Sequence, residues 1–413
     1  MPVEFKHTTL DNGLTIVAEV NPNAHTAATG FFVKAGSRDE VTELMGVSHF
    51  LEHMMFKGTE RRTAAEVNRD FDRIGANYNA STSQEVTNYY AHVLPEYLGD
   101  ALDLLTDILR PTLRGDDFDM EKNVILEEIG MYEDRPFWVA YEQVMERYFG
   151  PHPLGHRVLG TNDSITKLTR NQMMGYFNTR YSPNNMVASL AGRVDFDRCV
   201  DQIAKATESW TPAEVSRNYR PPQPVISDHH LTRSSTNMHY LVALTDAPSA
   251  QDDRRYAAAV LANVLGDSDG SRLYWKLIDP GIADEAELSH HSFDQTGVNL
   301  MYLSCSPSQA ERAETIFDEV LTGAGDNLTA EEVERATRKM AMDLTLQNER
   351  PAGRMMALGA QWLYLNKYLP LADELQRLTA VSVDDLQSLL TAYPLSPRAA
   401  VRLSPAAAPT SAQ

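Results

Sequence analysis

His49, Glu52 and His53 are the residues whose types and spacing point most directly to chemistry. The two histidines are four residues apart, so on a helix both imidazoles project from one face and can bind one zinc ion. Glu52 lies one turn on from His49, on the same face and beside the metal. Taken alone, this motif leaves an alternative open, which is a pair of core histidines satisfied by ordinary hydrogen bonds.

The element that must carry these residues is a helix that we expect over residues 45–57. Its other faces are covered by apolar side chains, which are Phe50, Leu51, Met54 and Met55. The pattern therefore predicts a helix buried around its circumference. Two histidines and a glutamate clustered on such a helix need partners, because unpaired polar groups are costly to bury.

A second expected helix, over residues 117–133, offers a third metal ligand. Zinc at a catalytic site takes three protein ligands and keeps one open position. The positions that share one core-facing stripe at helical spacing are Glu121, Val124, Ile125, Glu128, Ile129 and Tyr132. Carboxylates are rare in such a stripe unless they are paired or bound to metal. Glu128 is the expected ligand, whereas Glu127 points about 100° away around the helix.

Glu121 lies two turns before Glu128 on the same face of that helix. We expect it to support a ligating histidine through a hydrogen bond, as carboxylates behind metal ligands commonly do. The alternative is a surface carboxylate at a frayed helix start.

The sequence resembles the pitrilysin, insulysin and mitochondrial processing peptidase family of zinc metallopeptidases, whose H-x-x-E-H order is the inverzincin motif. The resemblance is carried by residues 49–59 and by Glu121 through Glu128, which lies 75 residues beyond His53. It runs from about residue 6 to residue 403, and its motifs are specific only in the first half. It implies that His49, His53 and Glu128 bind Zn2+ and that Glu52 is the general base.

A polar, β-forming segment, residues 76–90, reads as a strand. By the resemblance, Asn79 and Ala80 match a pair on an edge strand that binds the substrate backbone, although an ordinary sheet strand is the alternative. The implied activity is that of a zinc metalloendopeptidase acting on short or unfolded peptides. Two alternatives are a non-catalytic core subunit of a larger complex and a zinc hydrolase acting on something other than peptides.

Strands expected at 14–20 and 29–34, followed by helices and further strands, favour an α+β architecture. Similar patterns recur about 210 residues apart, which indicates a duplicated domain. With the resemblance, we expect two duplicated α/β-sandwich domains of the processing-peptidase (LuxS/metallohydrolase-like) type. The expected organisation is a zinc-bearing domain at 1–210, a linker at 211–226, a duplicated domain without a metal site at 227–403, and a disordered tail at 404–413.

The second half lacks metal-binding residues at the positions that correspond to the zinc motif, which residues 259–266 occupy. By the resemblance, active members place an Arg and a Tyr where this chain has Ile278 and Asp284, while Arg272 and Tyr274 belong to a preceding structural element. We therefore expect a heterodimer in which a paralogous subunit supplies the Arg/Tyr pair. A homodimer is the alternative assembly.

The composition limits the remaining possibilities. A net charge of −20 argues against nucleic acid as the main partner, because binding phosphate requires basic patches. No apolar run approaches the roughly 18 residues of a membrane span. Only two cysteines are present, without metal-pair spacing, and the first residues show no secretory signal. We therefore expect a cytoplasmic protein.

Overall fold

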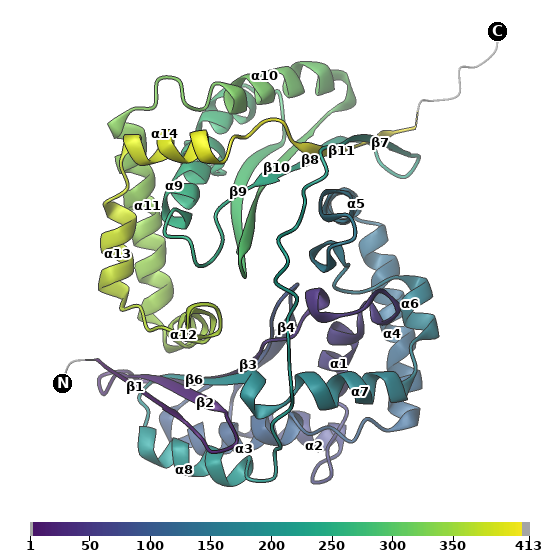
Figure 1. Cartoon of the computed structure of the whole chain (residues 1–413), viewed down its shortest axis with the longest axis vertical. Coiled ribbons are helices and arrows are strands. Elements are labelled where there is room, and N and C mark those ends of the chain that lie inside the picture. The colour runs from purple at the N-terminus through teal and green to yellow at the C-terminus, as the bar shows by residue number, and fades with distance from the viewer. Residues whose placement is uncertain (1–2, 407–413) are drawn as a thin grey trace. The chain divides into compact units, whose positions relative to one another are not determined.

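The computed structural model describes residues 3–406, which divide by their contacts into two units. The first unit comprises residues 3–130, 156–218 and 344–371. The second comprises residues 131–155, 219–343 and 372–406. Each unit is a mixed β-sheet flanked by helices (Figure 1), which confirms the predicted α+β class.

The sheet of the first unit has the strand order β1-β2-β6-β3-β5-β4. Its strands are β1 (Glu4–Thr9), β2 (Thr15–Val20), β3 (Ala27–Val33), β4 (Asn77–Thr82), β5 (Thr87–Val93) and β6 (Met186–Gly192). Strands β2 and β6 run parallel, and every other neighbouring pair is antiparallel. Strand β4 therefore forms one edge of this sheet.

The sheet of the second unit has the order β7-β11-β8-β10-β9. Its strands are β7 (Asp228–Arg233), β8 (His239–Asp246), β9 (Glu285–Phe293), β10 (Thr296–Cys305) and β11 (Ala399–Pro405). Here β7 and β11 are the parallel pair and the others are antiparallel. Apart from β1, the two sheets have the same order and the same directions. Corresponding strands β6 and β11 begin at Met186 and at Ala399, 213 residues later, and this repeat confirms the predicted duplication.

The domain boundaries expected from the sequence remain a proposal. Residues 211–226, the expected linker, belong to no helix or strand. The expectation of a disordered tail is wrong at Ser404 and Pro405, which are the last residues of β11, because they extend its pairing with β7. Residues 407–413 lie outside the described residues.

Helices flank each of the two sheets. Those of the first unit are α1 (Val47–Met55), α2 (Ala64–Arg73), α3 (Leu98–Ile108), α4 (Gly115–Glu133, whose last residues fall in the second unit), α6 (Asn162–Lys167), α7 (Arg170–Arg180), α8 (Phe196–Ala206) and α12 (Pro351–Leu365). Those of the second unit are α5 (Pro136–Phe149), α9 (Arg255–Gly266), α10 (Ala310–Thr322), α11 (Ala330–Glu349, whose last residues fall in the first unit), α13 (Leu371–Thr379) and α14 (Val383–Ala392).

Two helices, one from each half of the chain, pack on the sheet that the other half forms. Helix α12 comes from the second half but packs on β2, β3 and β6 of the first unit, opposite α3 and α8 (Figure 1). Its residue Gly359 lies so close to Phe32 that a Cβ atom would be 2.3 Å from the ring. Helix α5, from the first half, packs in the same way on β8 and β11 of the second unit. One face of the sheet that positions the candidate site is thus covered by a helix from the distant second half of the chain.

A buried ion pair attaches α12 to β2. Arg354 Nε and Nη2 donate to the two carboxylate oxygens of Glu19 at 3.0 and 2.6 Å, and both side chains are largely buried. We expect Arg354→Met to lower the free energy of unfolding by about 3–5 kcal/mol, because it leaves the Glu19 charge buried without its partner. Urea unfolding followed through tryptophan fluorescence would measure this. The control Lys167→Met, which removes an exposed pair with Asp163, is expected to cost less than about 1 kcal/mol. Equal losses would contradict the prediction.

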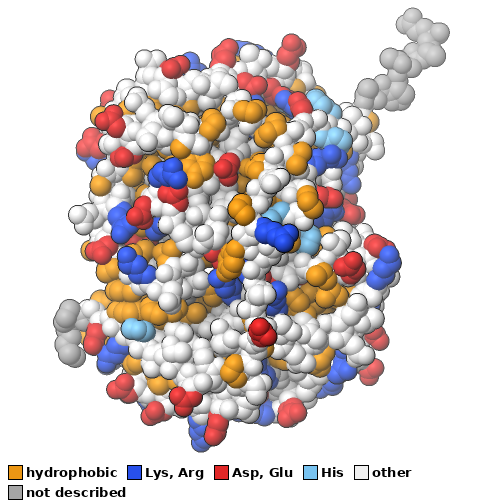
Figure 2. Space-filling view, in the orientation of Figure 1, with side chains coloured by type: hydrophobic (Ala, Val, Ile, Leu, Met, Phe, Trp, Pro, Cys, Tyr) orange, Lys and Arg blue, Asp and Glu red, His pale blue; other side chains and the backbone are white. Residues whose placement is uncertain are grey.

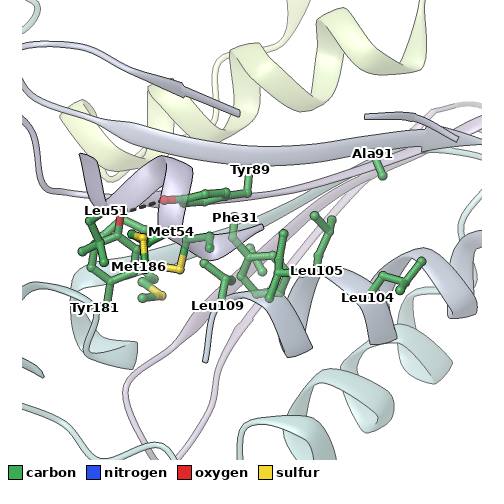
Figure 3. Packing of buried hydrophobic residues seen from close by; sticks show 14 of the residues in the cluster. Phe31, Leu51, Met54, Tyr89, Ala91, Leu104, Leu105, Leu109, Tyr181 and Met186 are labelled. Carbon is green, nitrogen blue, oxygen red and sulfur yellow. Dashed lines mark hydrogen bonds between the residues drawn. The ribbon is translucent and has the colours of Figure 1, made fainter. Parts of the chain in front are cut away.

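The core between the first sheet and its helices holds α1 in place. Leu51 and Met54 of α1 pack among Phe31, Tyr89 and Met186 from the sheet, with Leu105 and Leu109 from the α3 region beside them (Figure 3). The hydroxyl groups of Tyr89 and Tyr181 are joined by a hydrogen bond of 2.8 Å. The apolar side of α1 is therefore fixed by packing, as its sequence predicted.

Residues 76–90 form a hairpin of β4 and β5, and the interpretation as one strand was wrong. The chain turns at residues 83–86, where Ser83 N donates to Val86 O at 2.9 Å. The Ser83 hydroxyl also accepts from Val86 N, at 3.1 Å. This local bonding stabilises the turn, whereas the β-forming composition on both sides concealed it.

The surface carries charged side chains of both signs, as expected from a composition of 37 basic and 57 acidic residues. On the face shown in Figure 2, Lys and Arg side chains are interspersed with Asp and Glu side chains. Within residues 3–406, no helix is both long and apolar enough to cross a bilayer.

Candidate metal centre

Helix α1 begins at a fixed point because the carboxylate of Glu40 binds its N-terminal end. Glu40 accepts hydrogen bonds from Gly46 N at 2.7 Å and Ser48 N at 2.8 Å. These two bonds satisfy main-chain N–H groups that the first turn of a helix leaves without a partner, while burial raises the pKa of Glu40 to about 8. Gly46 has a positive φ of 91° and sits against Leu159 O, so other residues would be strained there. These contacts fix the start of the helix, and His49 lies in its first turn.

The structure brings His49, His53 and Glu128 together. Their nearest ligand atoms all lie within 4.8 Å of one another, and no other such group of three occurs in residues 3–406. Glu128 Oε2 is 3.7 Å from Nε2 of each histidine. These distances are too long for hydrogen bonds, but they are near the roughly 3.4 Å expected between atoms that share a tetrahedral zinc ion. The three atoms face one another without being bonded to one another.

The surroundings of His49 do not fit the alternative of a satisfied core histidine. Its side chain is buried, with 8% of the residue exposed, and Nδ1 has no hydrogen-bond partner in the described residues. Burial, followed by the charge of His53, lowers the pKa of His49 to about 3. His49 is therefore neutral at physiological pH, which is the form that binds a metal.

Glu121 is buried, with 3% of its surface exposed, and it forms a hydrogen bond with His53. Its Oε1 atom is 2.8 Å from His53 Nδ1, while Lys57 Nζ lies 2.5 Å from Oε2. Burial raises the pKa of Glu121, but the hydrogen bonds and charges of His53 and Lys57 outweigh it and lower that pKa overall. A charged Glu121 accepts a hydrogen bond from His53 Nδ1–H, and this bond directs His53 Nε2 towards Glu128.

This contact leads to a prediction for metal affinity. Glu121→Gln keeps the shape but removes the charge behind His53, so we expect the dissociation constant for zinc to rise about 10–100-fold. Competition with a zinc-binding dye would measure it. Asp119→Asn changes an exposed carboxylate on the same helix and is expected to leave the constant unchanged. Equal affinities for all three chains would show that Glu121 does not support the site.

Glu52 lies beside this group and is partly buried. Burial raises the pKa of Glu52, and the charge of Glu128 acts in the same direction. The hydrogen bond from Thr82 and the charge of His53 act against it, and the net shift is upward. Thr82 Oγ1 donates to Glu52 Oε2 at 2.6 Å. A carboxylate with a raised pKa is better suited to accept a proton at neutral pH.

Helix α4 is held against α1 by its own apolar face. Phe118 stacks on Phe50 with ring centroids 4.8 Å apart, and Ile125 and Ile129 are buried. Val124, expected in the buried stripe, is instead 42% exposed. The reason is that the buried face is centred on Phe118 and Ile125, and Val124 lies about 100° around the helix from that centre.

The two neighbouring glutamates of α4 differ as predicted. Glu127 is exposed, whereas Glu128 is partly buried beside the histidines.

Asn79 and Ala80 lie on the edge strand β4. Asn79 is exposed, and its Oδ1 atom accepts a hydrogen bond from Ala80 N at 2.9 Å. Ala80 is partly buried on the face of β4 that packs against the core around α1. Their role in substrate binding stays a prediction.

In the second half, the helix corresponding to α1 is α9, which consists mainly of buried alanine, valine and leucine residues. Arg272 forms two hydrogen bonds to Glu332, at 2.7 and 2.9 Å, and further bonds to the main-chain carbonyls of residues 324, 326 and 327. It is engaged within its own unit, in agreement with the structural role expected for it.

Two family models match the chain. The model described as "Insulinase (Peptidase family M16)" matches residues 15–162, and that described as "Peptidase M16 inactive domain" matches residues 167–340. The uncharacterised zinc protease YmxG of Bacillus subtilis is 34% identical over 391 residues, covering 93% of this chain and 94% of that protein. The chain belongs to peptidase family M16. An M16-type relative from Mycobacterium leprae, also named a zinc protease, is 33% identical over 393 residues and covers 92% and 87% of the two chains.

Solved structures show the same M16 fold. A protease from Helicobacter pylori has a TM-score of 0.91 at 22% identity, covering 98% of this chain and 100% of that one. A chain of complex III2 from Candida albicans has a TM-score of 0.84 at 18% identity, covering 97% and 95%. At these identities the likeness concerns the fold alone.

Three residues at this candidate site were not singled out from the sequence. They are Glu40, which binds the start of α1, Lys57, which pairs with Glu121, and Thr82, which binds Glu52. Lys57 follows His53 by four residues, and this helical spacing could have indicated that both side chains lie on the same side of α1. Thr82 alternates with Ala80 and Tyr78 on one face of its strand, but nothing local shows that this face meets Glu52.

Proposed function

We propose that the chain is a zinc-dependent metalloendopeptidase that hydrolyses short or unfolded peptides. The observation that carries the proposal is the convergence of His49, His53 and Glu128 with Glu52 beside them. Two imidazoles and one carboxylate are a ligand set that catalytic zinc takes, and they leave a position open. The relatives named zinc proteases support the choice of metal.

In this mechanism zinc, when bound, lowers the pKa of a water molecule and polarises the peptide carbonyl. Glu52 takes the proton from the attacking water and passes it to the departing amine. Thr82 donates to Glu52 Oε2, which leaves Oε1 available to receive this proton. Glu121 keeps the Nδ1 atom of His53 bonded and its Nε2 atom directed to the metal position.

The proposed substrate surface is the open edge of β4. Residues paired across an antiparallel hairpin alternate between hydrogen-bonded and non-hydrogen-bonded pairs. Ser83 and Val86 are hydrogen-bonded, so the pairs of Thr82 with Thr87 and Ala80 with Tyr89 are not. The main-chain groups of Ala80 and Thr82 therefore face outwards, where a peptide strand can add. The outward-facing Ala80 N–H donates to Asn79 Oδ1, and a bound peptide would take the place of Asn79 as the acceptor. Because a peptide strand pairs through main-chain hydrogen bonds, this surface would accept peptides of diverse sequence.

The proposal includes a paralogous partner subunit that supplies an Arg/Tyr pair. It is supported by Ile278 and Asp284 at the corresponding places and by the engagement of Arg272 with Glu332. Donors aimed at the developing oxyanion contribute several kcal/mol, so a chain without them should be slow. Light scattering would separate this heterodimer from the alternative homodimer, and a rise in rate on adding the paralogue would support the former.

A cytoplasmic location is also part of the proposal. Cys199 and Cys305 are free and buried, which fits a reducing compartment. Cell fractionation tests this, and recovery outside the cytoplasm would contradict it.

The direct test is cleavage of a quenched fluorogenic peptide library by the purified chain, with zinc measured in the same sample. We expect one zinc per chain and metal-dependent cleavage. Zinc with little cleavage would favour the partner-dependent form. Zinc without cleavage under any assembly would favour a scaffold role, a second candidate supported by the "inactive domain" description of the second model.

A further inference from the structure

Thr82 joins two parts of the proposed active site. It is the last residue of β4, and its side chain lies on the face of the strand that meets α1. Its hydroxyl donates to Glu52 Oε2 at 2.6 Å. A hydroxyl group carries one proton, so this proton is committed to Glu52. The neighbouring Thr87 hydroxyl, 3.4 Å away, donates instead to Ala35 O at 3.0 Å.

The main chain of the same residue faces in a different direction. Because the Thr82–Thr87 pair is not hydrogen-bonded, the Thr82 N–H and C=O project from the edge of the sheet. Beyond Thr82 the edge is closed, since Ser83 O accepts from Ser37 N and Gln84 O accepts from Arg38 N. Thr82 is therefore the last position at which a peptide strand can pair, and it is also the residue that binds the general base.

We propose that Thr82 is a positioning residue that fixes the carboxylate of Glu52 relative to a peptide bound on β4. This inference rests on the proposed function and deepens it. The hydrogen bond to Oε2 prevents rotation of the carboxylate and keeps Oε1 in place to take the proton. A proton acceptor displaced by even about 1 Å can cost about 10²-fold in rate. Because β4 also binds the substrate, this one strand sets the positions of both the scissile peptide bond and the general base.

The experiment compares Thr82→Val with Thr82→Ser. Valine keeps the shape and removes the hydroxyl, whereas serine keeps the hydroxyl. We expect Thr82→Val to lower kcat for a fluorogenic peptide about tenfold or more, with KM and zinc content unchanged. Thr82→Ser should stay within about threefold of the wild type. If Thr82→Val does not fold, as judged by its melting curve, Thr82→Ala is measured against Thr82→Ser in its place.

A second measurement tests whether Thr82→Val lowers kcat by acting through Glu52. In the Glu52→Gln background, Thr82→Val should change the residual rate by less than about twofold, because the group that it positions is already gone. Wild-type kcat in Thr82→Val, a change in KM alone, or an undiminished loss in the Glu52→Gln background would each overturn the role of Thr82. These rates are measured in whichever assembly is most active. Failure of the proposed function is distinguishable, since the wild-type chain would then show no peptide turnover in any assembly.

Discussion

Glu52→Gln is expected to lower kcat for peptide hydrolysis by about 10²–10⁴-fold and to leave one zinc bound per chain. The rate falls because an amide cannot accept the proton of the attacking water, and general-base catalysis typically contributes a factor of this size. Zinc stays because Glu52 is not among the three residues whose ligand atoms converge. Single-turnover or steady-state rates, with zinc measured by mass spectrometry on the same sample, give both quantities.

A matched control for this variant is Glu43→Gln, which changes an exposed carboxylate nine residues earlier in the chain. It should retain the wild-type rate. If Glu52→Gln also retained that rate, Glu52 would not be the base. If it lost its zinc, Glu52 would have to be counted among the ligands, and Glu128 would need re-examination.

Removal of a ligand is expected to abolish zinc binding and activity together. His53→Ala or Glu128→Gln leaves two of the three converging groups, which is too few to hold zinc at a catalytic site. The rate should fall at least as far as in Glu52→Gln, because the base then has no activated water. Zinc content and rate measured on one preparation test the coupling between the two losses.

Glu127→Gln is the matched control for Glu128→Gln. The two residues are adjacent on α4, but Glu127 is exposed and Glu128 lies beside the histidines. The control should keep both zinc and activity. The reverse outcome, with zinc lost in Glu127→Gln and kept in Glu128→Gln, would contradict the assignment of the third ligand.

The helical part of the site could be predicted because a helix has a fixed period. His49, Glu52 and His53 had to share a face once residues 47–55 were helical, and the carboxylates of Glu121 and Glu128 stood out in an apolar pattern. The same reasoning failed at Val124, since helical spacing gives a stripe but not the centre of the buried face. Neighbouring helices decide that, and here Phe50 does so by stacking on Phe118.

The contact between Thr82 and Glu52 could not be predicted, because no pattern in the sequence indicates it. Thr82 meets Glu52 only because the hairpin of β4 and β5 packs on α1, and the turn at Ser83 that makes this hairpin was hidden within a continuous β-forming segment.

The duplication was visible as a recurring pattern, but the exchange of α5 and α12 was not. The apolar pattern of a helix does not specify which of two sheets it covers. The choice rests on tertiary contacts such as Arg354 with Glu19 and Gly359 against Phe32.

The central claim is that peptide hydrolysis depends on one zinc ion bound by His49, His53 and Glu128. The most direct test is to remove metal from the chain, in whichever assembly is most active, and titrate zinc back while recording peptide cleavage. We predict that the rate rises in proportion to added zinc and saturates at one zinc per chain. Cleavage that survives complete metal removal, or that saturates at a different stoichiometry, would contradict this account.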